Sequence, residues 1–576
     1  MARYNGDVPN DTEPEPIAQA TEEFIDPRLV VGPLLRHVDE TSAVVWVEVA
    51  AATEVAVHAG GRSWTARTFT AHGHHYGVVD VEGLQAGDNL PYTVSIDGDQ
   101  VWPPSGSVHP PSRIRTLDHE RPLTVAFGSC RTSVAHDAAG NRKHGVDALR
   151  AMSLRMMEQD ESAWPDLVLF LGDQVYADET SPAMREFITS RRSVDEAPGE
   201  ELKDFEEYAH LYRLAWSDSV NRWLLSTLQS AMIFDDHDIR DDWNTSAAWR
   251  QEMAATLWWR DRIVGGLGSY WIYQHLGNLS LSDRAEDPVW RHVSGAEGED
   301  VTEFLDSFAE KADVEPDSYR WSHARDLGRT RLIVVDSRCA RVLQPDDRQM
   351  LDPAEMGWLD GLLQGGRDHI LIGTSLPYLL PAGLHHLEAW DEAVAAGAWG
   401  GRGRKVGERI RQGADLEHWA AFQDSFQQVA AMARDVVNGR RGTAPATVTF
   451  LSGDVHHSYL AEVELPEPSA DGRILQAVCS PIRNPMPRAL RFGFAAMAYG
   501  FAWPAGRVAA RSAKVPSPPF RWRITKGPWF SNSIATLEVK GRDIRLVWEK
   551  SVTGDGDNAH PELERVAAVD ITEPAG

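Results

Sequence analysis

The sequence predicts an α/β domain preceded by a small all-β domain. Residues 28–117 contain short β-type runs separated by turn residues. After Pro122 strands alternate with loops and helices, a pattern typical of an α/β domain. Within that part, Leu167 to Leu171 form a continuous apolar run, as expected for a strand buried on both faces of a sheet. These three observations define the fold class.

The length and charge of the chain limit its organisation and its partners. At 576 residues the chain exceeds one ordinary hydrophobic core, so we expect two domains or one large elaborated domain. Its 57 Lys and Arg against 85 Asp and Glu give a formal net charge of −28. This charge repels polyanions, so we expect no nucleic-acid partner.

Several features predict a cytoplasmic protein. Residues 1–27 resemble a disordered acidic arm, without an apolar signal segment or a twin-Arg motif. No stretch of 18 uninterrupted apolar residues occurs, so we expect no membrane-spanning helix. The three cysteines cannot form a disulfide framework, which favours a reducing compartment.

The first domain is expected to be a β-sandwich over residues 28–117. Its predicted strands are separated by Gly, Asp and Asn turns at the spacing of such folds. They are 43–49, 54–58, 64–70, 75–81 and 91–96. The Pro-rich segment 102–111 is the expected exit linker.

The second domain is expected over residues 118–555. Its predicted strands are 123–127, 167–171, 231–234, 330–335, 369–373 and 447–451, and its predicted helices are 145–158, 201–226, 246–263 and 407–437. Four later strands (459–463, 474–478, 533–539 and 544–548) follow without clear helices, which predicts an antiparallel end to the sheet. Residues 483–530 are expected to form an irregular insertion, and 556–576 a C-terminal tail.

Side chains that bind metals follow four of the predicted strands. The segments are Gly128-Ser-Cys130, Gly172-Asp173-Gln-Val-Tyr176-Ala-Asp178, Asp235-Asp236-His237-Asp238 and Gly453-Asp454-Val-His456-His457. Because the carboxyl ends of neighbouring parallel strands meet at one edge, these segments are expected to converge on a single site.

Each segment alone has a simpler explanation. Cys130 could be a small buried hydrophobe, the run from Asp235 a solvated turn or a helix cap, and His456 a histidine satisfied by backbone partners. However, carboxylates clustered this densely repel one another unless a cation neutralises them. The four segments together therefore indicate a metal site.

The same motifs carry a resemblance to a known family. Gly172-Asp-x-x-Tyr176, Asp235-Asp-His-Asp238 and Gly453-Asp-x-His456 resemble the motifs of calcineurin-like metallophosphoesterases, and together with Gly-Ser-Cys130 they resemble alkaline phosphatase D, the PhoD-like family. The resemblance spans most of residues 28–480. It implies a metallophosphoesterase-type sheet sandwich flanked by helices, behind an N-terminal β-sandwich. It also implies metal-dependent hydrolysis of small phosphate esters.

The resemblance further implies an Fe(III) and a Ca(II) site, with other divalent metals left open. The implied iron ligands are Cys130, Tyr176 and His456, and Asp173 is implied to bridge the iron and the calcium. Asp236 and Asp454 are the implied calcium ligands, and Asp241 or Asp242 is a candidate for a further calcium ligand. Thiolate, phenolate and imidazole suit a transition metal, whereas carboxylates suit calcium. The sequence departs from ordinary metallophosphoesterases in having no His within 372–375 and Asp454 in place of a His. Both departures remove nitrogen ligands, which is consistent with calcium.

Two residues have implied or predicted roles in catalysis. His237 follows a candidate ligand where the superfamily places the histidine that assists the leaving group. Arg131 could bind the phosphate as a two-pronged donor, or it could pair with an acidic neighbour.

Several alternatives stay open. The same residues would serve a phosphodiesterase or a phospholipase D-like hydrolase. A non-catalytic binding protein with structural metals belongs to a different class. A third alternative makes Cys130 a covalent nucleophile with His237 as its base. The sequence does not define the substrate or the oligomeric state.

Overall fold

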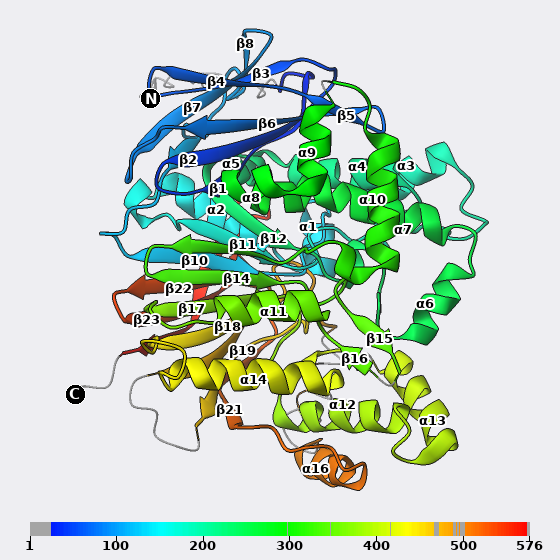
Figure 1. Ribbon diagram of the computed structural model, residues 1–576. Helices are drawn as coiled ribbons and strands as arrows, with labels where there is room; N and C mark the ends of the chain where they lie inside the picture. The colour runs from blue at the N-terminus through cyan, green and yellow to red at the C-terminus, as the bar shows by residue number, and fades with distance from the viewer. Residues whose placement is uncertain are drawn as a thin grey trace, which may run out of the picture.

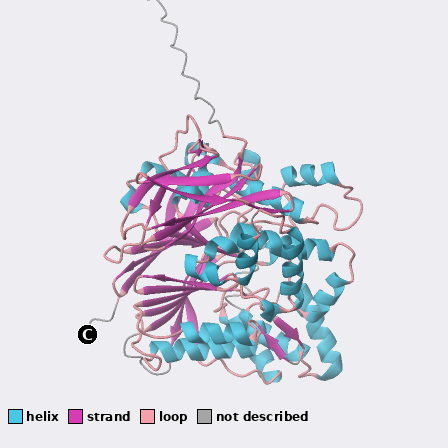
Figure 2. Ribbon diagram, turned by 45° about the horizontal axis from the view of Figure 1, so that its top comes forward, coloured by secondary structure: helices cyan, strands magenta, loops and turns pink. Residues whose placement is uncertain are grey.

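The computed structural model describes residues 25–572 except 297, 346, 415, 466–471, 488–490, 492–494 and 496–501. Most of the predicted acidic arm, residues 1–24, lies outside the described residues. Figure 1 shows a β-sandwich at one end, two sheets in the middle and a lobe of α12, α13 and α16 at the other end. In Figure 2 the strands form stacked layers on one side, and most helices lie on the other. Within the described residues, no helix is long and apolar enough to cross a membrane.

The N-terminal domain is a sandwich of two antiparallel sheets. Its strands are β1 (Leu29–Val38), β2 (Ser42–Val49), β3 (Glu54–Ala59), β4 (Arg62–Arg67), β5 (Phe69–Ala71), β6 (His74–Glu82), β7 (Asn89–Ile96), β8 (Asp99–Trp102) and β9 (Arg113–Arg115). One sheet has the order β1-β2-β6-β5 and the other β4-β3-β7-β8, with β9 paired to β7. Val45 and Val57 lie in the core of the sandwich. Val44 and Trp46, on the other face of β2, pack into the core of the second domain.

Two larger sheets form the centre of the second domain. The six-stranded sheet has the order β12-β11-β10-β22-β23-β24 and the seven-stranded sheet β13-β14-β17-β18-β20-β19-β21. The strands of the first are β10 (Leu123–Gly128), β11 (Leu167–Leu171), β12 (Gln229–Ile233), β22 (Ser533–Lys540), β23 (Asp543–Thr553) and β24 (Pro561–Ile571). Those of the second are β13 (His323–Leu327), β14 (Thr330–Val335), β17 (His369–Thr374), β18 (Thr447–Ser452), β19 (Ser458–Glu464), β20 (Arg473–Val478) and β21 (Arg521–Trp529). A two-stranded ribbon, β15 (Val342–Gln344) and β16 (Asp347–Gln349), lies beside them.

The two sheets pack face to face, and helices cover their outer faces. Leu169 of β11 and Leu371 of β17 belong to the same apolar core, which lies between the two sheets. The opposite face of β11 packs against helices through Phe170, and that of β17 through Ile372. The helices are α1 (Ala138–His144), α2 (Ala148–Glu158), α3 (Pro182–Arg191), α4 (Phe205–Trp216), α5 (Ser219–Thr227), α6 (Ala247–Ala254), α7 (Trp259–Tyr270), α8 (Leu281–Glu286), α9 (Pro288–Gly295), α10 (Thr302–Val314), α11 (Pro353–Leu362), α12 (Ala382–Ala395), α13 (Gly400–Gly413), α14 (Gln423–Val437) and α16 (Ala502–Ser512). The metallophosphoesterase-type sheet sandwich behind a small β-sandwich is therefore present.

Most of the parallel and antiparallel pairings follow the prediction. Strands β10, β11 and β12 run parallel, as do β14, β17, β18 and β20. The late strands β19, β21, β22, β23 and β24 pair antiparallel. The predicted antiparallel end is thus confirmed for 459–463, 533–539 and 544–548, whereas 474–478 (β20) pairs parallel with β18 and antiparallel only with β19.

Three predicted helices are interrupted. The helix expected over 201–226 breaks at Asp218, because the side chain of Asp218 accepts a hydrogen bond from the backbone N–H of Asn221 and starts α5. The helix expected over 246–263 divides into α6 and α7. The helix expected over 407–437 ends as α13 at Gly413, and α14 begins at Gln423.

Two predictions near the C-terminus need correction. The segment 483–530 is not wholly irregular, since it contains α16 and β21, and β21 pairs with β19. Residues 561–571 are not a tail but the edge strand β24, which pairs with β23 over its whole length. Leu563, Val566 and Val569 supply apolar contacts that hold this strand against the sheet.

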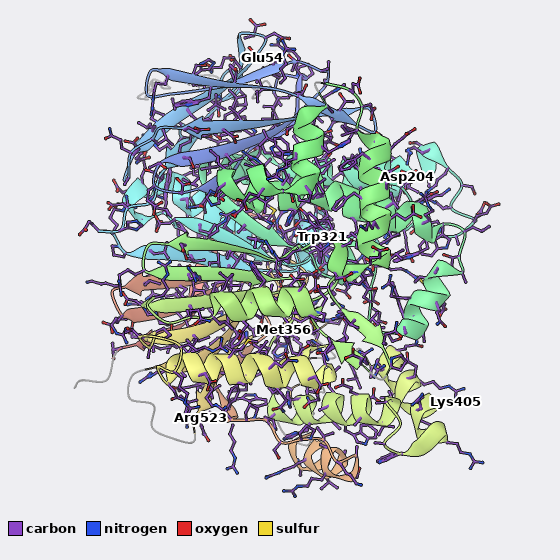
Figure 3. The ribbon with its side chains drawn as sticks, in the orientation of Figure 1. Glu54, Asp204, Trp321, Met356, Lys405 and Arg523 are labelled. Atoms are coloured by element: carbon purple, nitrogen blue, oxygen red, sulfur yellow. The ribbon has the colours of Figure 1, made fainter. Side chains whose placement is uncertain are left out.

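Several large aromatic side chains form part of the packed core. Trp243 and Trp271 are fully buried. Trp321, labelled at the centre of Figure 3, has its ring 5.3 Å from that of Tyr270 and 5.8 Å from that of Phe234. These aromatic contacts connect α7 to the strand that precedes the candidate site.

Candidate metal centre at the carboxyl ends of the strands

The four predicted segments meet where the two central sheets end. β10, β11 and β12 are in register, so Cys130, Asp173 and Asp235 follow neighbouring strand ends. Asp454 follows β18 of the other sheet, and its backbone N–H donates to Ser129 Oγ over 3.0 Å. The thiol of Cys130 donates to the Asp454 carbonyl oxygen over 3.7 Å. The edges of the two sheets therefore form one site.

The backbone at this edge adopts conformations that most residues avoid. The φ angles are +56° at Cys130, +49° at Asp173, +63° at Asp454 and +49° at His456. Left-handed backbone at residues other than glycine costs free energy and concentrates at functional sites. Gly172 has a φ of +100°, and a Cβ there would lie 2.6 Å from Cβ of Asp235. Glycine is therefore required at the turn that places Asp173 beside Asp235.

Three buried aspartates form the centre of the site. One carboxylate oxygen from each of Asp173, Asp235 and Asp236 lies within 4.8 Å of the others. Oδ1 of Asp173 and Oδ2 of Asp235 are buried and have no hydrogen-bond partner in the described part of the chain. Burial raises the pKa of Asp173 and Asp235 well above the ordinary value, and that of Asp236 to about 6. Unpaired carboxylate oxygens in this arrangement fit a bound cation.

Tyr176 contacts Asp173, and the backbone N–H of Cys130 donates to the carbonyl oxygen of the neighbouring Gly172 over 3.3 Å. The hydroxyl of Tyr176 donates to Oδ2 of Asp173 over 3.5 Å. The Cys130 sulfur accepts a hydrogen bond from Ser480 Oγ over 3.3 Å. Burial raises the pKa of the Cys130 thiol to about 12, and the charge of Asp454 adds to this increase. A nearby cation would be needed to favour the thiolate, which is the metal-binding form.

Asp454 and His456 occupy the loop after β18. His418 Nε2 lies 3.1 Å from Oδ2 of Asp454, and His418 Nδ1 lies 3.0 Å from Oε1 of Glu388. Burial raises the pKa of Asp454, but the hydrogen bond and charge of His418 outweigh this effect and lower it to about 2. Burial also lowers the pKa of His456 to about 4, which keeps its imidazole neutral and able to bind a metal.

His237 is held by a carboxylate behind it. Its Nδ1 lies 2.9 Å from Oδ1 and 3.0 Å from Oδ2 of Asp178. Its ring centroid lies 4.9 Å from that of Tyr176. Burial lowers the pKa of His237, but the charges of Asp178 and Asp236 outweigh burial and raise it well above the ordinary value. A protonated imidazole beside the acidic cluster has the chemistry of a general acid.

Asp241 and Asp242 have different positions. Asp236, His237 and Asp241 form a second group whose ligand atoms lie within 4.8 Å of one another. The side chain of Asp241 is 69% exposed. Asp242 instead donates its backbone N–H to Oδ2 of Asp236 over 3.1 Å. Asp241 is thus the better placed of the two to bind a ligand at the mouth of the site.

The geometry does not support Arg131 as a phosphate ligand. Its Nε and Nη2 donate to Oδ2 of Asp147 over 3.1 and 2.9 Å, and its Nη1 donates to the Ala215 carbonyl. The side chains of Arg131 and Asp147 are only 4% and 0% exposed. The structure agrees with the alternative, in which Arg131 pairs with an acidic neighbour.

Sequence reasoning missed a buried arginine within the acidic cluster. Nε of Arg338 lies 2.5 Å from Oδ1 of Asp235, its Nη2 lies 3.1 Å from Oδ1 of Asp236, and its Nη1 lies 2.5 Å from Oε1 of Glu417. Asp336 accepts hydrogen bonds from three successive backbone N–H groups and fixes the loop that carries Arg338. Arg338 and Glu417 come from distant loops, so no local spacing could have linked them to the site.

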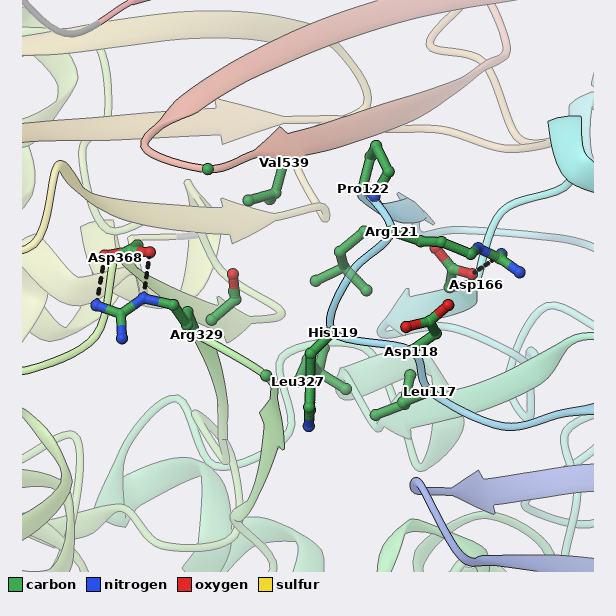
Figure 4. A pocket seen from close by; sticks show the side chains of 14 residues that line it. Leu117, Asp118, His119, Arg121, Pro122, Asp166, Leu327, Arg329, Asp368 and Val539 are labelled. Atoms are coloured by element: carbon green, nitrogen blue, oxygen red, sulfur yellow. Dashed lines mark hydrogen bonds and ion pairs between the residues drawn. The ribbon is translucent and has the colours of Figure 1, made fainter. Parts of the chain in front are cut away.

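The molecule has cavities at both ends of the strands. The pocket in Figure 4, of about 110 Å³, is lined by Leu123 and Thr330 at the starts of β10 and β14. Its arginines are paired, Arg329 with Asp368 over 2.5 Å and Arg121 with Asp166 over 3.4 Å. It lies at the opposite strand ends from the acidic cluster and is separate from it. A cavity of about 540 Å³ adjoins the cluster itself.

Comparison with known proteins agrees with this geometry. Residues 145–489 match the model of the PhoD-like phosphatase family, and residues 26–114 match a domain of unknown function (DUF7800). A solved structure of PhoD covers 96% of this chain and 91% of its own, at 13% identity and a TM-score of 0.58, and so supports the fold. A type III pullulan hydrolase from Thermococcus kodakarensis aligns at 11% identity over 91% of this chain and 93% of its own, but its TM-score of 0.14 carries no weight. No curated protein matches. The family match covers more than half of the chain, which therefore belongs to the PhoD-like phosphatases.

Proposed function

We propose that this phosphatase hydrolyses phosphate esters at a two-metal centre that holds Fe(III) and Ca(II). The proposed iron ligands are Cys130, Tyr176 and His456; the proposed calcium ligands are Asp236 and Asp454; Asp173 is proposed to bridge the two ions. The thiol, phenol and imidazole groups suit iron, and the carboxylates suit calcium.

One observation supports this centre above all others. The buried oxygens Asp173 Oδ1 and Asp235 Oδ2 have no hydrogen-bond partner in the described residues, although both lie in a cluster of carboxylates. Buried carboxylates without partners are unfavourable, and a bound cation supplies the missing charge. We therefore add Asp235 to the candidate ligands, with Arg338 holding its other oxygen.

The residues around this centre are proposed to have different roles in hydrolysis. When bound, the two ions would supply positive charge for the phosphate oxygens and would lower the pKa of an attacking water. Asp178 holds Nδ1 of His237, so that Nε2 remains to give a proton to the oxygen of the leaving group. Such proton transfer contributes about 10²- to 10⁴-fold to the rate. Arg338 offsets the negative charge of Asp235 and Asp236.

Phosphate monoesters are the proposed main substrates, and diesters a second class. The same residues would serve both, so parallel assays with a nitrophenyl monoester and a bis-nitrophenyl diester test the preference. If protein that contains the metals hydrolyses neither compound and no other ester, this result would favour a non-catalytic binding protein. The variant Cys130→Ser distinguishes two roles of Cys130. If Cys130 is an iron ligand, the variant should have an altered iron content. If Cys130 is a covalent nucleophile, the variant should retain its iron and lose all turnover.

The iron assignment has an optical test. A tyrosinate bound to Fe(III) absorbs visible light, so metal-replete protein should be coloured and Tyr176→Phe should lose the band. Colourless, iron-free and active protein would remove Tyr176 from the ligand set. We also propose a reducing compartment for the protein, supported by Cys130, Cys339 and Cys479, which are buried as free thiols.

A further inference from the structure

A continuous cavity joins the candidate metal centre to an apolar wall. The cavity has a volume of about 540 Å³. Asp236, His237 and Asp454 of the centre line it. It is also lined by Leu384, Leu387 and Trp390 of α12 and by Ile410 of α13.

The wall is a regular face of α12. Leu384, Leu387 and Trp390 follow one another at three-residue steps, which places them on one side of the helix. Ile410 of α13 faces the same space. All four are partly accessible, whereas His385 between them is buried on the other side of α12. Apolar side chains that line a concave space are typical of ligand sites.

The acidic and the apolar lining residues together predict how a substrate would lie. A phosphate at the acidic end would place its ester oxygen near His237, the proposed proton donor. The organic group on that oxygen would then extend toward Leu387 and Ile410. Glu388 of α12 also lines the cavity, but its carboxylate is paired with His418 over 3.0 Å. Leu384, Leu387 and Ile410 offer no hydrogen bond, so a hydroxyl-rich group such as a sugar would lose hydrogen bonds to water against them without replacement.

We propose that the wall of Leu384, Leu387, Trp390 and Ile410 binds the organic group of the substrate, and that the preferred substrates are phosphate esters with a large apolar group. This inference rests on the proposed function, because it assumes that phosphate binds at the acidic end. The apolar group is a long alkyl chain or an aromatic ring, which either a free amphiphile or a lipid could supply.

A series of n-alkyl phosphates from methyl to decyl tests the proposal. Each added methylene should raise kcat/KM about three- to fourfold until the chain outgrows the cavity. Leu387→Asp should flatten this rise, measured as the ratio of kcat/KM for decyl phosphate to kcat/KM for methyl phosphate in the same variant. Val508→Asp on α16, at a 68% exposed position outside the lining, is the matched control and should keep the rise. An equal kcat/KM for methyl and decyl phosphate would overturn the proposal.

Binding provides a readout that does not need turnover. By calorimetry with the metal-replete protein, decylphosphonate should bind at least tenfold tighter than methylphosphonate, and Leu387→Asp should remove the difference. Equal binding of the two phosphonates would overturn the proposal even in an inactive protein. Failure to hydrolyse any ester, including methyl phosphate, would instead contradict the proposed function.

The source of the apolar group is tested separately. Decyl phosphate as a dissolved monomer is compared with phosphatidic acid in phosphatidylcholine vesicles. Faster turnover of the monomer supports a free amphiphile, and faster turnover in vesicles supports a lipid; either result supports the apolar wall. Slow turnover of both decyl phosphate and phosphatidic acid, together with rapid turnover of methyl phosphate, would overturn the proposal of an apolar wall.

Discussion

Nδ1 of His237 lies 2.9 Å from Oδ1 of Asp178, and Oδ2 of the same carboxylate accepts the backbone N–H of Asp241 over 2.6 Å. Asp178 follows β11 and His237 follows β12, so the contact connects two neighbouring strand ends. The carboxylate fixes the ring orientation, which directs Nε2 away from Asp178. This arrangement makes Asp178 a positioning residue for the proposed general acid.

Replacement of His237 tests its role through the leaving group. We expect His237→Ala to lower kcat by about 10²- to 10⁴-fold for an alkyl phosphate, because the departing alkoxide needs a proton. The loss should be much smaller for nitrophenyl phosphate, whose leaving group is stable without one. Steady-state kinetics with both esters measure the difference. An equal loss for both would show that His237 acts in some other way.

Asp178→Asn should produce a weaker form of the same defect. The amide still reaches Nδ1 of His237 but no longer offers a carboxylate to it. Since the charge of Asp178 helps to raise the pKa of His237, the alkaline limb of the profile, where His237 loses its proton, should shift to lower pH in this variant. The pH profile of kcat measures the shift. An unchanged profile with reduced activity would indicate a structural defect only.

Arg131 is expected to contribute to stability and not to substrate binding. Arg131→Met would remove the closest ion-pair partner of the buried Asp147 and leave, within the described residues, only His136 at 4.0 Å, at a cost of about 3–5 kcal/mol in the free energy of unfolding. Arg150→Met is the control, because its pair with Asp218 is partly exposed and should cost less. Denaturant unfolding measures both. A stable Arg131→Met protein with a raised KM would restore the phosphate-binding role.

Gly172 is expected to be essential for the geometry of the acidic cluster. Gly172→Ala would force a Cβ within 2.6 Å of Asp235 at a φ of +100° and should disrupt metal binding. Gly357→Ala in α11 is the matched control, because no atom lies within 4 Å of the added Cβ, and it should stabilise the helix by about 1 kcal/mol. Metal content and thermal unfolding distinguish the two variants. Full metal loading of Gly172→Ala would contradict the proposed geometry.

His74 is expected to make stability depend on pH at the contact between the two domains. Its Nδ1 lies 2.8 Å from Glu48 of β2, and its Nε2 lies 2.9 Å from Glu206 of α4. Burial lowers the pKa of His74, but the two carboxylates outweigh burial and raise it from 6.5 to about 8. Because the pKa is raised on folding, this stabilisation is complete below pH 6.5 and is lost as the pH rises through about 8.

A comparison of thermal unfolding between pH 6 and 9 tests this dependence. At pH 6 the free energy of unfolding of the unmodified protein should exceed that of His74→Gln by about 1 kcal/mol, after allowance for partial exposure of His74. This difference should vanish by pH 9. His119→Gln is the control, since its pair with Glu40 is half exposed and should contribute little at any pH. A constant difference across the range would rule out the proposed linkage.

The sequence predicted those features that depend on local pattern. The continuous apolar run at β11 and the alternation of strands and helices predicted the central strands. Residues that follow four strand ends do lie together. Arg338, Glu417 and His418 were missed because loops far apart in sequence bring them to the site. The helix expected over 407–437 is broken for the same reason: Glu417 and His418 leave the helical path to reach Arg338 and Asp454.

The metal content of the purified protein tests the central claim most directly. We predict that elemental analysis finds iron and calcium in amounts comparable to the protein, and that Asp173→Asn loses both metals and turnover while its thermal unfolding remains cooperative. Full phosphatase activity in Asp173→Asn, or in protein free of both metals, would contradict the account.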